Sequence, residues 1–543
     1  MQLRSISTIL TNRSLFRRRR AEAAEVLAPY FRHGFWGRHK IITGLVLALI
    51  AALHGLLFGF TLTYYLVELL IPTVIVSFIA IGLLPDNGRA FDKTITFFFF
   101  SFIAVLAVWP DYLALSLPGL PWVTAIRLVG IPLSIVFLIS LSQSGSYRAT
   151  LTSTLRQSGM VWKFLLAYFV IAAITLPLSE TPTISLNKYI VALYSWLAIF
   201  LVAICTFKTP GRVRKFAQLL WVTTIISCLV GLQEYRMSEV PWAGRIPSFL
   251  KIEDPSIARI LSGIVRAALG EHRVQGKFTT PLSFAEFLAL VMPFLIHFMI
   301  AGRGYIERIA AGVTIPLVIF IIITTDSRLG VIGLILTVLG YLFFWALNRW
   351  RRERKSIFAP FIVIGYPVLS GFLLLSSFYV GRVRNAVWGS GAYQASNDAR
   401  ETQLADGLAI IARQPWGNGI GRAAETLGYT DLEGFLTIDS YYLSIALEVG
   451  VLGFIAYYGA FLLAIWQGTR VSLEASESEQ TAWLAPAVLA LINYFVIKSV
   501  LSQQENHPLV FALLGLVLAL IYQVKTGAAS KTDGIRAGQV GAG

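Results

Sequence analysis

The 543-residue sequence is poor in cysteine, histidine and charge, and each shortage excludes a class of protein. Its two cysteines, Cys205 and Cys228, both lie in apolar runs, which excludes a disulfide framework and a thiolate metal site. None of the six histidines is spaced as part of a ligand pair, so we expect no metal centre and no cofactor. Only 14% of the residues are charged and 56% are hydrophobic, which excludes an ordinary soluble enzyme and a disordered protein. The composition predicts an integral membrane protein.

Long apolar runs are what the sequence has in place of charge. A run of roughly 20 apolar residues crosses a bilayer as a helix, because only a helix satisfies every backbone polar group internally. We therefore predict an all-α integral membrane protein with about 14 transmembrane helices and two long periplasmic loops that contain amphipathic helices. The runs centre near Ala51, Val74, Phe102, Ile131, Phe169, Leu197, Thr224, Val291, Ile319, Leu336, Ile364, Ile455, Leu491 and Leu516.

The formal net charge of +16 comes in short bursts between the apolar runs, as in membrane topology signals. The first 40 residues are strongly basic, and alternate connections after them are basic too, so the positive-inside rule places both termini in the cytoplasm. The cluster from Arg17 to Arg20 is interpreted as an anchor on anionic membrane lipids rather than a nucleic-acid site. No small-residue cleavage motif follows the first run, so we expect no removable signal peptide.

These patterns divide the chain into seven predicted segments. They are a basic cytoplasmic arm (1–40), N-terminal transmembrane helices (41–232), a first long periplasmic loop (233–280), central transmembrane helices (281–378), a second long periplasmic loop (379–440), C-terminal transmembrane helices (441–523) and a cytoplasmic tail (524–543). Both long loops carry arginines that the orienting bias should remove from the outer side. We therefore expect an anionic substrate outside the membrane.

The first loop ends at a basic segment that leads directly into an apolar run. Arg273 and Lys277 in this segment are expected at the outer membrane rim, where an arginine can hold a phosphate through two parallel hydrogen bonds. Anchoring of these side chains at the interface explains them equally well. A tight turn at 324–330 likewise raises Asp326 and Arg328 to the outer surface, where the two could simply pair with each other.

The second loop contains a helical pattern in which Leu404, Leu408 and Ile411 recur with polar residues between them. This pattern predicts an amphipathic helix on the membrane surface, with Arg400 near its beginning, the end that favours anions. The glycine-rich segment after Pro415 resembles a phosphate loop, but no strand precedes it, so a sharp helix-ending turn is the favoured interpretation.

Asp439 stands where the second loop enters the next apolar run. Partial desolvation there would raise the pKa of a carboxylate and make it a better base, whereas helix capping by Asp439 or Ser440 is the structural alternative. Two ionisable residues lie inside predicted spans: Arg127, about a turn and a half from the outer end, and Glu448. Such residues are expensive in lipid and face a cavity or a partner. Lys163 and Lys498 are attributed to snorkelling or to pairing within the bundle.

Taken in order, these blocks resemble the bacterial O-antigen ligase and O-antigen polymerase superfamily over roughly Arg273 to Leu516. Three blocks are an Arg-x-x-Gly-x-Phe-x-x-Pro entry to a span, a Thr-x-Ser-Arg turn, and a helix from Arg400 to a glycine-rich end. The fourth runs from a His-Asn pair through Tyr-Leu to Glu-x-Gly-x-x-Gly. The matching residues are Arg273, Gly276, Phe278, Pro281, Thr325, Ser327, Arg328, Arg400, Pro415, Gly417, Gly419, Gly421, Tyr442, Leu443, Glu448, Gly450 and Gly453. The His and Asn positions hold Asp439 and Ser440 instead.

The resemblance implies a multi-span glycosyltransferase of the bacterial inner membrane whose active site faces the periplasm. Its donor and acceptor would be undecaprenyl-pyrophosphate-linked glycans, joined by a metal-independent, inverting transfer, and a chain-length-regulating partner is expected from the resemblance alone. Asp439 would accept the proton of the acceptor hydroxyl, and Arg400 would supply positive charge to the leaving pyrophosphate. Arg273, Arg328, Arg127 and Lys277 would bind the pyrophosphate, with Tyr442 and Glu448 in support. By this resemblance, the acidic residue at position 439 fits a polymerase better than a ligase, because the ligases have a histidine there.

Two alternatives remain open. A ligase would transfer finished polymer to lipid A core sugar, and the sequence does not separate it from a polymerase. A polysaccharide flippase or secondary transporter also needs many spans and basic cavities. Transporters, however, bind their substrates near the membrane midplane on interrupted helices, whereas the unusual charges of this chain lie mainly in the outward loops.

Overall fold

The computed structural model describes residues 66–527 except 85, 87, 89, 117–121, 253, 267–270, 354–356, 380, 382–393, 432–433 and 475–480, together with isolated residues between 42 and 52. The predicted arm (1–40), the run centre at Ala51, the first part of the second loop and residues 528–543 of the tail lie outside the described residues. The described chain is mainly helical, as an all-α membrane protein requires.

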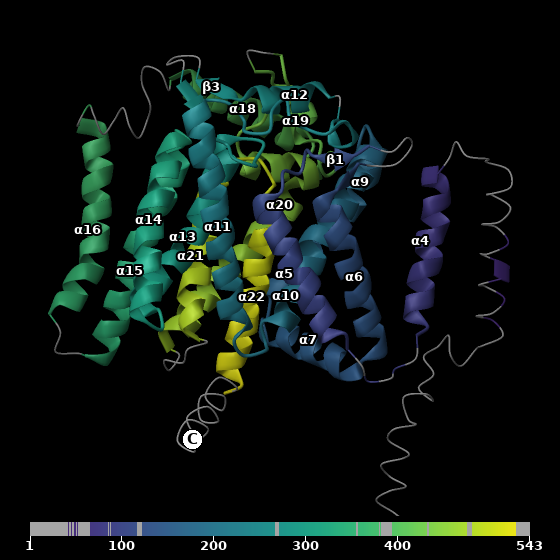
Figure 1. The fold of residues 1–543 in the computed structure, drawn as a ribbon, viewed down its shortest axis with the longest axis horizontal. Helices are drawn as coiled ribbons and strands as arrows, with labels where there is room; N and C mark the ends of the chain where they lie inside the picture. Colours follow the sequence, from purple (N-terminus) through teal and green to yellow (C-terminus); the bar gives the residue numbers. More distant parts are fainter. Residues whose placement is uncertain are drawn as a thin grey trace, which may run out of the picture.

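Helices account for nearly all regular structure in the described residues (Figure 1). The longer ones are α4 (Leu66–Gly82), α5 (Asp92–Val108), α6 (Ala125–Gln143), α7 (Gly145–Gln157), α8 (Val161–Ile174), α9 (Pro182–Ala192), α10 (Ala198–Thr206), α11 (Arg212–Met237), α12 (Pro255–Ser262), α13 (Pro281–Ala301), α14 (Tyr305–Thr324), α15 (Arg328–Arg352), α16 (Phe358–Tyr379), α18 (Gln394–Arg413), α20 (Tyr441–Glu474), α21 (Leu484–Ile497) and α22 (His507–Lys525). The shorter ones are α19 (Ala423–Leu427), the 3-10 helices η2 (Leu176–Leu178), η4 (Ser248–Leu250) and η7 (Thr481–Trp483), and the π-helical turn η3 (Leu193–Leu197). Two small antiparallel hairpins pair β1 (Ala114–Leu115) with β2 (Val123–Thr124) and β3 (Ile264–Arg266) with β4 (Glu271–Arg273).

Nine helical stretches within the described residues are long and apolar enough to cross a bilayer. They are Ala125–Gln143, Val161–Leu178, Pro182–Thr206, Arg212–Met237, Pro281–Ala301, Tyr305–Thr324, Arg328–Arg351, Tyr441–Glu474 and His507–Lys525. Helical structure also covers every predicted run centre from Val74 to Leu516, which agrees with the multi-span reading. The predicted total of about fourteen spans stays a prediction.

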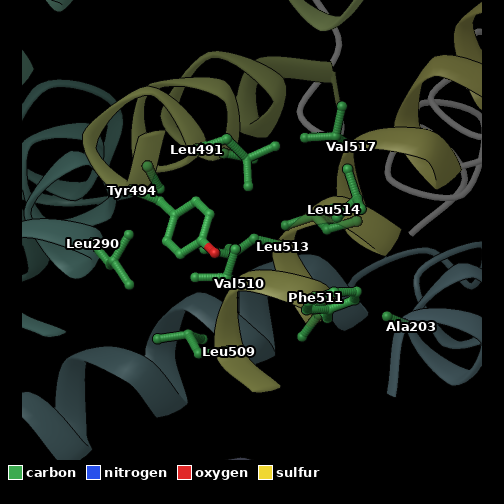
Figure 2. Packing of buried hydrophobic residues seen from close by; sticks show 14 of the residues in the cluster. Ala203, Leu290, Leu491, Tyr494, Leu509, Val510, Phe511, Leu513, Leu514 and Val517 are labelled. Carbon is green, nitrogen blue, oxygen red and sulfur yellow. The ribbon is translucent and has the colours of Figure 1, made fainter. Parts of the chain in front are cut away.

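Helices α13 and α22 form the centre of the bundle and are the most enclosed of the nine. Helix α13 packs against α14, α15 and α21, and α22 packs against α10, α20 and α21. Figure 2 shows side chains of α10, α13, α21 and α22 gathered in this core, including Leu290, Tyr494 and Phe511. The Tyr494 hydroxyl is hydrogen-bonded to the Tyr457 hydroxyl and, at 3.0 Å, to Nε2 of His507, so this buried hydroxyl has partners.

The bundle has two chemically different ends, named here the loop end and the α7 end (Figure 1). The loop end carries α12, α18, α19 and the β3–β4 hairpin, which belong to the two long predicted loops. The α7 end carries α7 and the last turn of α22, where Lys525 Nζ donates to the Gln157 carbonyl at 3.2 Å. Paired basic residues also lie at this end, among them Arg148 with Asp86 and Arg212 with Asp92.

Candidate active site

The predicted catalytic residues meet at the loop end, where α18 lies against the beginning of α20. Arg400 Nε donates to Asp439 Oδ2 at 3.1 Å, and the Gln403 side chain accepts from the Asp439 amide at 2.9 Å. Gly407 allows this close approach, because a Cβ at that position would lie 2.6 Å from Leu443. Both side chains of the ion pair remain about 30% exposed, so a substrate could reach them.

Asp439 is free of a capping role because Ser440 caps the first turn of α20. The Ser440 hydroxyl accepts from the Leu443 amide at 3.5 Å, which leaves the Asp439 carboxylate directed to Arg400. Of the two residues proposed for capping, the structure uses Ser440.

Helix α18 turns two residues of its predicted apolar stripe away from the protein, whereas the third, Ile411, packs against a buried apolar cluster. Gln403 and Gly407 are buried against α20, whereas Leu404 and Leu408 are about half exposed. The helix exists where the sequence predicts it, and its outward leucines suit an apolar surrounding. Its position on a membrane surface stays a prediction.

The glycine-rich segment after α18 is a structural joint, as the helix-ending interpretation predicts. Gly417, Gly419 and Gly421 all have positive φ, and the Gly419 amide donates to the Glu448 carbonyl of α20 at 2.9 Å. Helix α20 breaks its regular geometry beside this segment, at Gly450, whose φ is 72°. The Val451 amide there donates to the Pro415 carbonyl at 2.9 Å. The joint therefore fixes the end of α18 relative to α20.

Glu448 lies in this joint and is buried, which agrees with the expectation that it faces a partner. Its carboxylate is hydrogen-bonded to the backbone at Gly421 and Ala423 and interacts electrostatically with Lys188 of α9. The sequence analysis did not select Lys188, although it is an ionisable residue within an apolar run. Glu448 thus has a structural environment, and a supporting role in the reaction stays a prediction.

Arg273 and the Thr-x-Ser-Arg turn, which are 52 residues apart, are in direct contact. Arg273 Nε donates to the Thr325 carbonyl at 3.0 Å, and another guanidinium nitrogen donates to the Asp326 carbonyl at 3.3 Å. Asp326 has a φ of 48°, so the turn is as tight as predicted, and Arg328 begins α15 directly after it. The resemblance blocks at 273–281 and 325–328 therefore form one unit.

A buried glutamate that the sequence argument missed holds the Arg273 segment in place. Glu234 of α11 accepts from the amides of Gln275 and Gly276 at 3.1 and 2.6 Å, and its other contact is His272 Nε2 at 2.9 Å. Pro281 then starts α13 at a position where its missing N–H is not needed. Glu234 was hidden in the sequence because it lies in the last turns of a long apolar helix.

The connection between α21 and α22, residues 499–506, joins these parts and was also missed. Ser502 Oγ donates to the Ile438 carbonyl beside Asp439, and Glu505 Oε1 accepts from the Thr279 amide at 3.0 Å. Leu501 belongs to an apolar cluster that includes Leu329 of the first turn of α15. This connection, named here the α21–α22 loop, therefore contacts the Asp439 segment, the entry to α13 and the start of α15.

Two buried charges anchor both sides of the α21–α22 loop. Lys498 Nζ lies 2.9 Å from Glu286 Oε1, and Asn506 Nδ2 donates to Glu286 Oε2 at 2.9 Å. The Lys498 carbonyl accepts from the Tyr441 amide at 3.0 Å, so the pair also supports the start of α20. Pairing of Lys498 within the bundle, as the sequence suggested, is confirmed.

The Lys277 side chain is buried, which the sequence did not predict, and its place at the membrane rim stays a prediction. Its ammonium lies 4.2 Å from the centre of the Phe278 ring and interacts electrostatically with Asp111. Burial raises the pKa of the Asp111 carboxyl to about 6, an effect that Lys277 opposes. The spacing of residues 273–281 could not reveal this position, since Asp111 comes from the distant connection after α5.

Arg127 and Tyr442 each link two helices. Arg127 is the third residue of α6 and not a turn and a half inside a span, because α6 begins only at Ala125. It donates to the Trp122 carbonyl at 2.7 Å and to Asn187 of α9 at 3.4 Å, so these contacts lie between α6 and α9. The Tyr442 hydroxyl donates to the Phe495 carbonyl of α21 and so ties the beginning of α20 to its neighbour.

The assembled site offers cationic groups beside a carboxylate at the exposed end of a helical bundle. Arg400, with one of its five donors on Asp439, can still present hydrogen-bond donors to an anion. Arg273 and Arg328 come from one unit that the α21–α22 loop connects to the Asp439 segment. In the described residues no group of three or more His, Cys, Asp or Glu side chains is arranged to hold a metal ion.

Part of the chain matches a family of known proteins. Residues 313–458 match the family model described as O-antigen ligase, and no curated protein matches the chain. The match covers the Thr-x-Ser-Arg turn, Arg400, the glycine joint and Asp439. Arg273, Glu286 and the α21–α22 loop lie outside it, so the structure adds parts of the site that the match does not reach.

Proposed function

We propose that this chain, whose residues 313–458 match the O-antigen ligase family model, is a multi-pass membrane glycosyltransferase and the polymerase of a lipid-linked-repeat pathway. In this proposal it transfers a growing glycan from undecaprenyl pyrophosphate to a sugar hydroxyl of a second lipid-linked repeat. The reaction takes place at the loop end, on the periplasmic side of the bacterial inner membrane, with both termini in the cytoplasm.

The Arg400–Asp439 pair is the observation that carries the proposal. Glycosyl transfer from a pyrophosphate needs positive charge for the leaving group and an acceptor for the hydroxyl proton, and this pair supplies both within 3.1 Å. Other residues hold both members of the pair in place. Gln403 accepts from the Asp439 amide, and the glycine joint holds α18, the helix that carries Arg400. Such fixed charges stabilise a developing charge without reorganising during the reaction.

The proposed step breaks the bond between the donor sugar carbon and the pyrophosphate oxygen and forms a new bond from that carbon to the acceptor oxygen. The acceptor proton passes to the Asp439 carboxylate, and the electron pair of the broken bond leaves with the lipid pyrophosphate. As the pyrophosphate binds, it competes with Asp439 for the Arg400 guanidinium, which frees the carboxylate to contact the acceptor hydroxyl. Inversion follows from direct attack on the face opposite the leaving group.

Arg273 and Arg328 are proposed to bind the pyrophosphate from the neighbouring unit. The Thr325 and Asp326 carbonyls orient the Arg273 guanidinium, and Arg328 stands in the first turn of α15, where the helix dipole also favours an anion. The burial of Lys277 favours a positioning role toward Asp111 over direct contact with the substrate. Arg127 would contact the donor only if the substrate extends to α9.

A ligase is the second candidate, favoured by the printed description of the matching family. It would use the same leaving group and a lipid A core sugar as the acceptor. Asp439 in place of the family's histidine favours the polymerase. The acceptor requirement separates the two, because a polymerase needs only lipid-linked repeats.

The test supplies purified, reconstituted protein with a single lipid-linked repeat and resolves the products by length. Wild type is expected to make a ladder without any second acceptor. If Asp439 is the base, Asp439→Asn and Asp439→Ala lose similar activity, about 100-fold or more, the usual contribution of a positioned general base. Arg400→Ala is expected to lose about as much, and Arg400→Lys less, because lysine keeps the charge but not the fork.

Asp406→Asn is the matched control, since Asp406 is exposed on the same helix as Arg400. It should retain the wild-type ladder. Appreciable turnover in Asp439→Asn but not in Asp439→Ala would assign Asp439 to orienting the acceptor. A wild-type protein that forms product only when lipid A core is added is a ligase.

A further inference from the structure

A polar cavity lies at the loop end, at the opposite end of α18 from Arg400. Its volume is about 410 Å³, and its walls come from η2 and its connection to α9, the end of α18, the glycine joint and α19. The polar groups that line it include Glu180, Arg413, Gln414, Asn418, Arg422 and Glu425. Nothing in the proposed transfer step uses these residues.

One wall of this cavity is firmly built. The Arg422 side chain is only 11% exposed and pairs with Glu425 at 3.2 Å and, more loosely, with Glu180 at 4.0 Å. Asn418 is held by its side-chain amide, which donates to the Leu447 carbonyl of α20 at 3.1 Å. The facing wall is different: Arg413 and Gln414 are exposed, and Arg413 makes no ion pair among the described residues.

The charge balance of the lining points to the class of ligand. Two arginines face two glutamates, so the cavity has no surplus of positive charge such as a phosphate site needs. It instead offers donors and acceptors side by side, together with the aliphatic side chains of Leu178 and Ile410. Sugar rings carry hydroxyl groups that donate and accept and also present apolar C–H surfaces. The lining therefore fits a saccharide better than a lipid phosphate.

The position of the cavity on α18 gives its relation to the reaction. Arg400 and Arg413 are thirteen residues apart on one helix, which corresponds to roughly 20 Å along its axis. A glycan whose end lies at the Arg400–Asp439 pair spans that distance with several sugar residues. The glycine joint fixes the cavity end of this path, because it connects α18 to α20 beside the cavity.

We propose that this cavity is a remote subsite that holds sugar residues of the growing glycan while its lipid-linked end reacts. The inference rests on the proposed function for the identity of the glycan. Retention at such a subsite keeps the chain bound between additions, so its loss shifts products toward shorter lengths.

Product length and direct binding test the proposal together. In the reconstituted reaction, Arg413→Ala is expected to lower the ratio of long products to the first condensation product about tenfold, the effect of losing one charge-assisted hydrogen bond. Thr426→Tyr, which fills the cavity from α19, should do the same. Arg245→Ala removes an exposed arginine elsewhere at the loop end and should leave the length distribution as in wild type.

The binding probe is a set of oligosaccharides released by mild acid from the polysaccharide of the cells that carry the protein. Wild type should bind them about ten times more tightly than Arg413→Ala, measured by saturation-transfer NMR in detergent. Equal lengths and equal binding in wild type and Arg413→Ala overturn the subsite. If wild type binds the oligosaccharides through Arg413 but makes no ladder, the subsite stands and the polymerase proposal fails.

Discussion

At the residue scale, the molecule concentrates its buried charge around the α21–α22 loop. Lys498 and Glu286 are both fully buried and lie 2.9 Å apart, with Asn506 as a third partner. Removing one member of such a pair leaves an uncompensated buried charge and commonly costs about 3–5 kcal/mol, far more than the pair contributes to net stability. The pair is therefore better understood as fixing the position of the loop than as a source of stability.

Asp111 gives a pH dependence with a defined sign. Burial raises the pKa of its carboxyl from an ordinary value of 3.8 to about 6, against the opposing effect of Lys277. Between about pH 4 and 6 the folded protein therefore binds more protons at this group than the unfolded chain, so stability falls as the pH rises. The cost reaches about 3 kcal/mol above pH 6, since each pKa unit corresponds to 1.36 kcal/mol.

Thermal unfolding in detergent at pH 4, 5 and 7 measures this effect. Asp111→Asn lacks the titrating group, so its melting temperature relative to wild type should increase from pH 4 to pH 7. Asp406→Asn changes an exposed carboxylate and should show no such trend. A constant difference between wild type and Asp111→Asn over this range would contradict the assignment.

At the element scale, the site depends on how α18 is joined to α20. The joint uses positive-φ glycines on one side and a break in α20 on the other, so that loop amides satisfy carbonyls that the broken helix leaves open. A Cβ on Gly450 would lie 2.3 Å from the Pro415 carbonyl oxygen, and one on Gly417 would lie 2.5 Å from the Glu448 carbonyl oxygen. The backbones interlock with no room for a side chain.

Gly450→Ala should therefore push the Pro415 segment away from α20 and break the contact between α18 and α20. The Gly450 backbone, with φ 72° and ψ −179°, lies in a region that is open essentially to glycine alone and costs another residue about 1–3 kcal/mol. The added Cβ would also clash with the facing backbone. We expect a lower melting temperature and loss of glycan transfer. Gly312→Ala is the control, because a Cβ there meets nothing within 4 Å, and alanine stabilises a helix relative to glycine by up to about 1 kcal/mol. Unchanged stability and transfer in Gly450→Ala would show that the joint can rearrange.

The sequence predicted elements better than their contacts. Hydropathy located the apolar runs, because a membrane helix is defined by its own residues, and it identified Arg400 and Asp439 because both stand near helix ends. The burial of Lys277 was not predicted, and Glu234, Glu286 and Glu505 were not selected, because the contacts of these residues are with partners about 40 to 230 residues away in the chain. The substrate roles of Arg273, Arg328 and Arg400 stay predictions, although the structure brings the first two into one unit.

At the scale of the whole molecule, the proposed site and the basic residues that predict the orientation lie at opposite ends of the bundle. The α7 end collects paired basic residues such as Arg148 and Arg212, whereas the loop end carries the proposed site. Helices α4 and α16 stand at opposite edges of the bundle in Figure 1, and most of the described apolar side chains of α16 are exposed, as suits lipid contact. The positive-inside rule then predicts that the α7 end faces the cytoplasm.

Cysteine labelling in intact spheroplasts tests this orientation, and both native cysteines are buried, so background labelling should be low. A cysteine at Glu425 should react with a membrane-impermeant maleimide. One at Gln157, at the α7 end, should react only after the membrane is opened. The reverse pattern would invert the predicted topology and place the site in the cytoplasm.

The α21–α22 loop contacts the proposed site but lies outside the residues that match the family model. Residues 313–458, named here the signature region, match the family model, yet the loop that connects Asp439 to Thr279 and to the start of α15 lies between α21 and α22. A chimaera that exchanges only the signature region between two such proteins would combine one parent's carboxylate and arginine with the other parent's scaffold. Exchange of acceptor preference should therefore require α13, α21 and α22 to be transplanted together with the signature region.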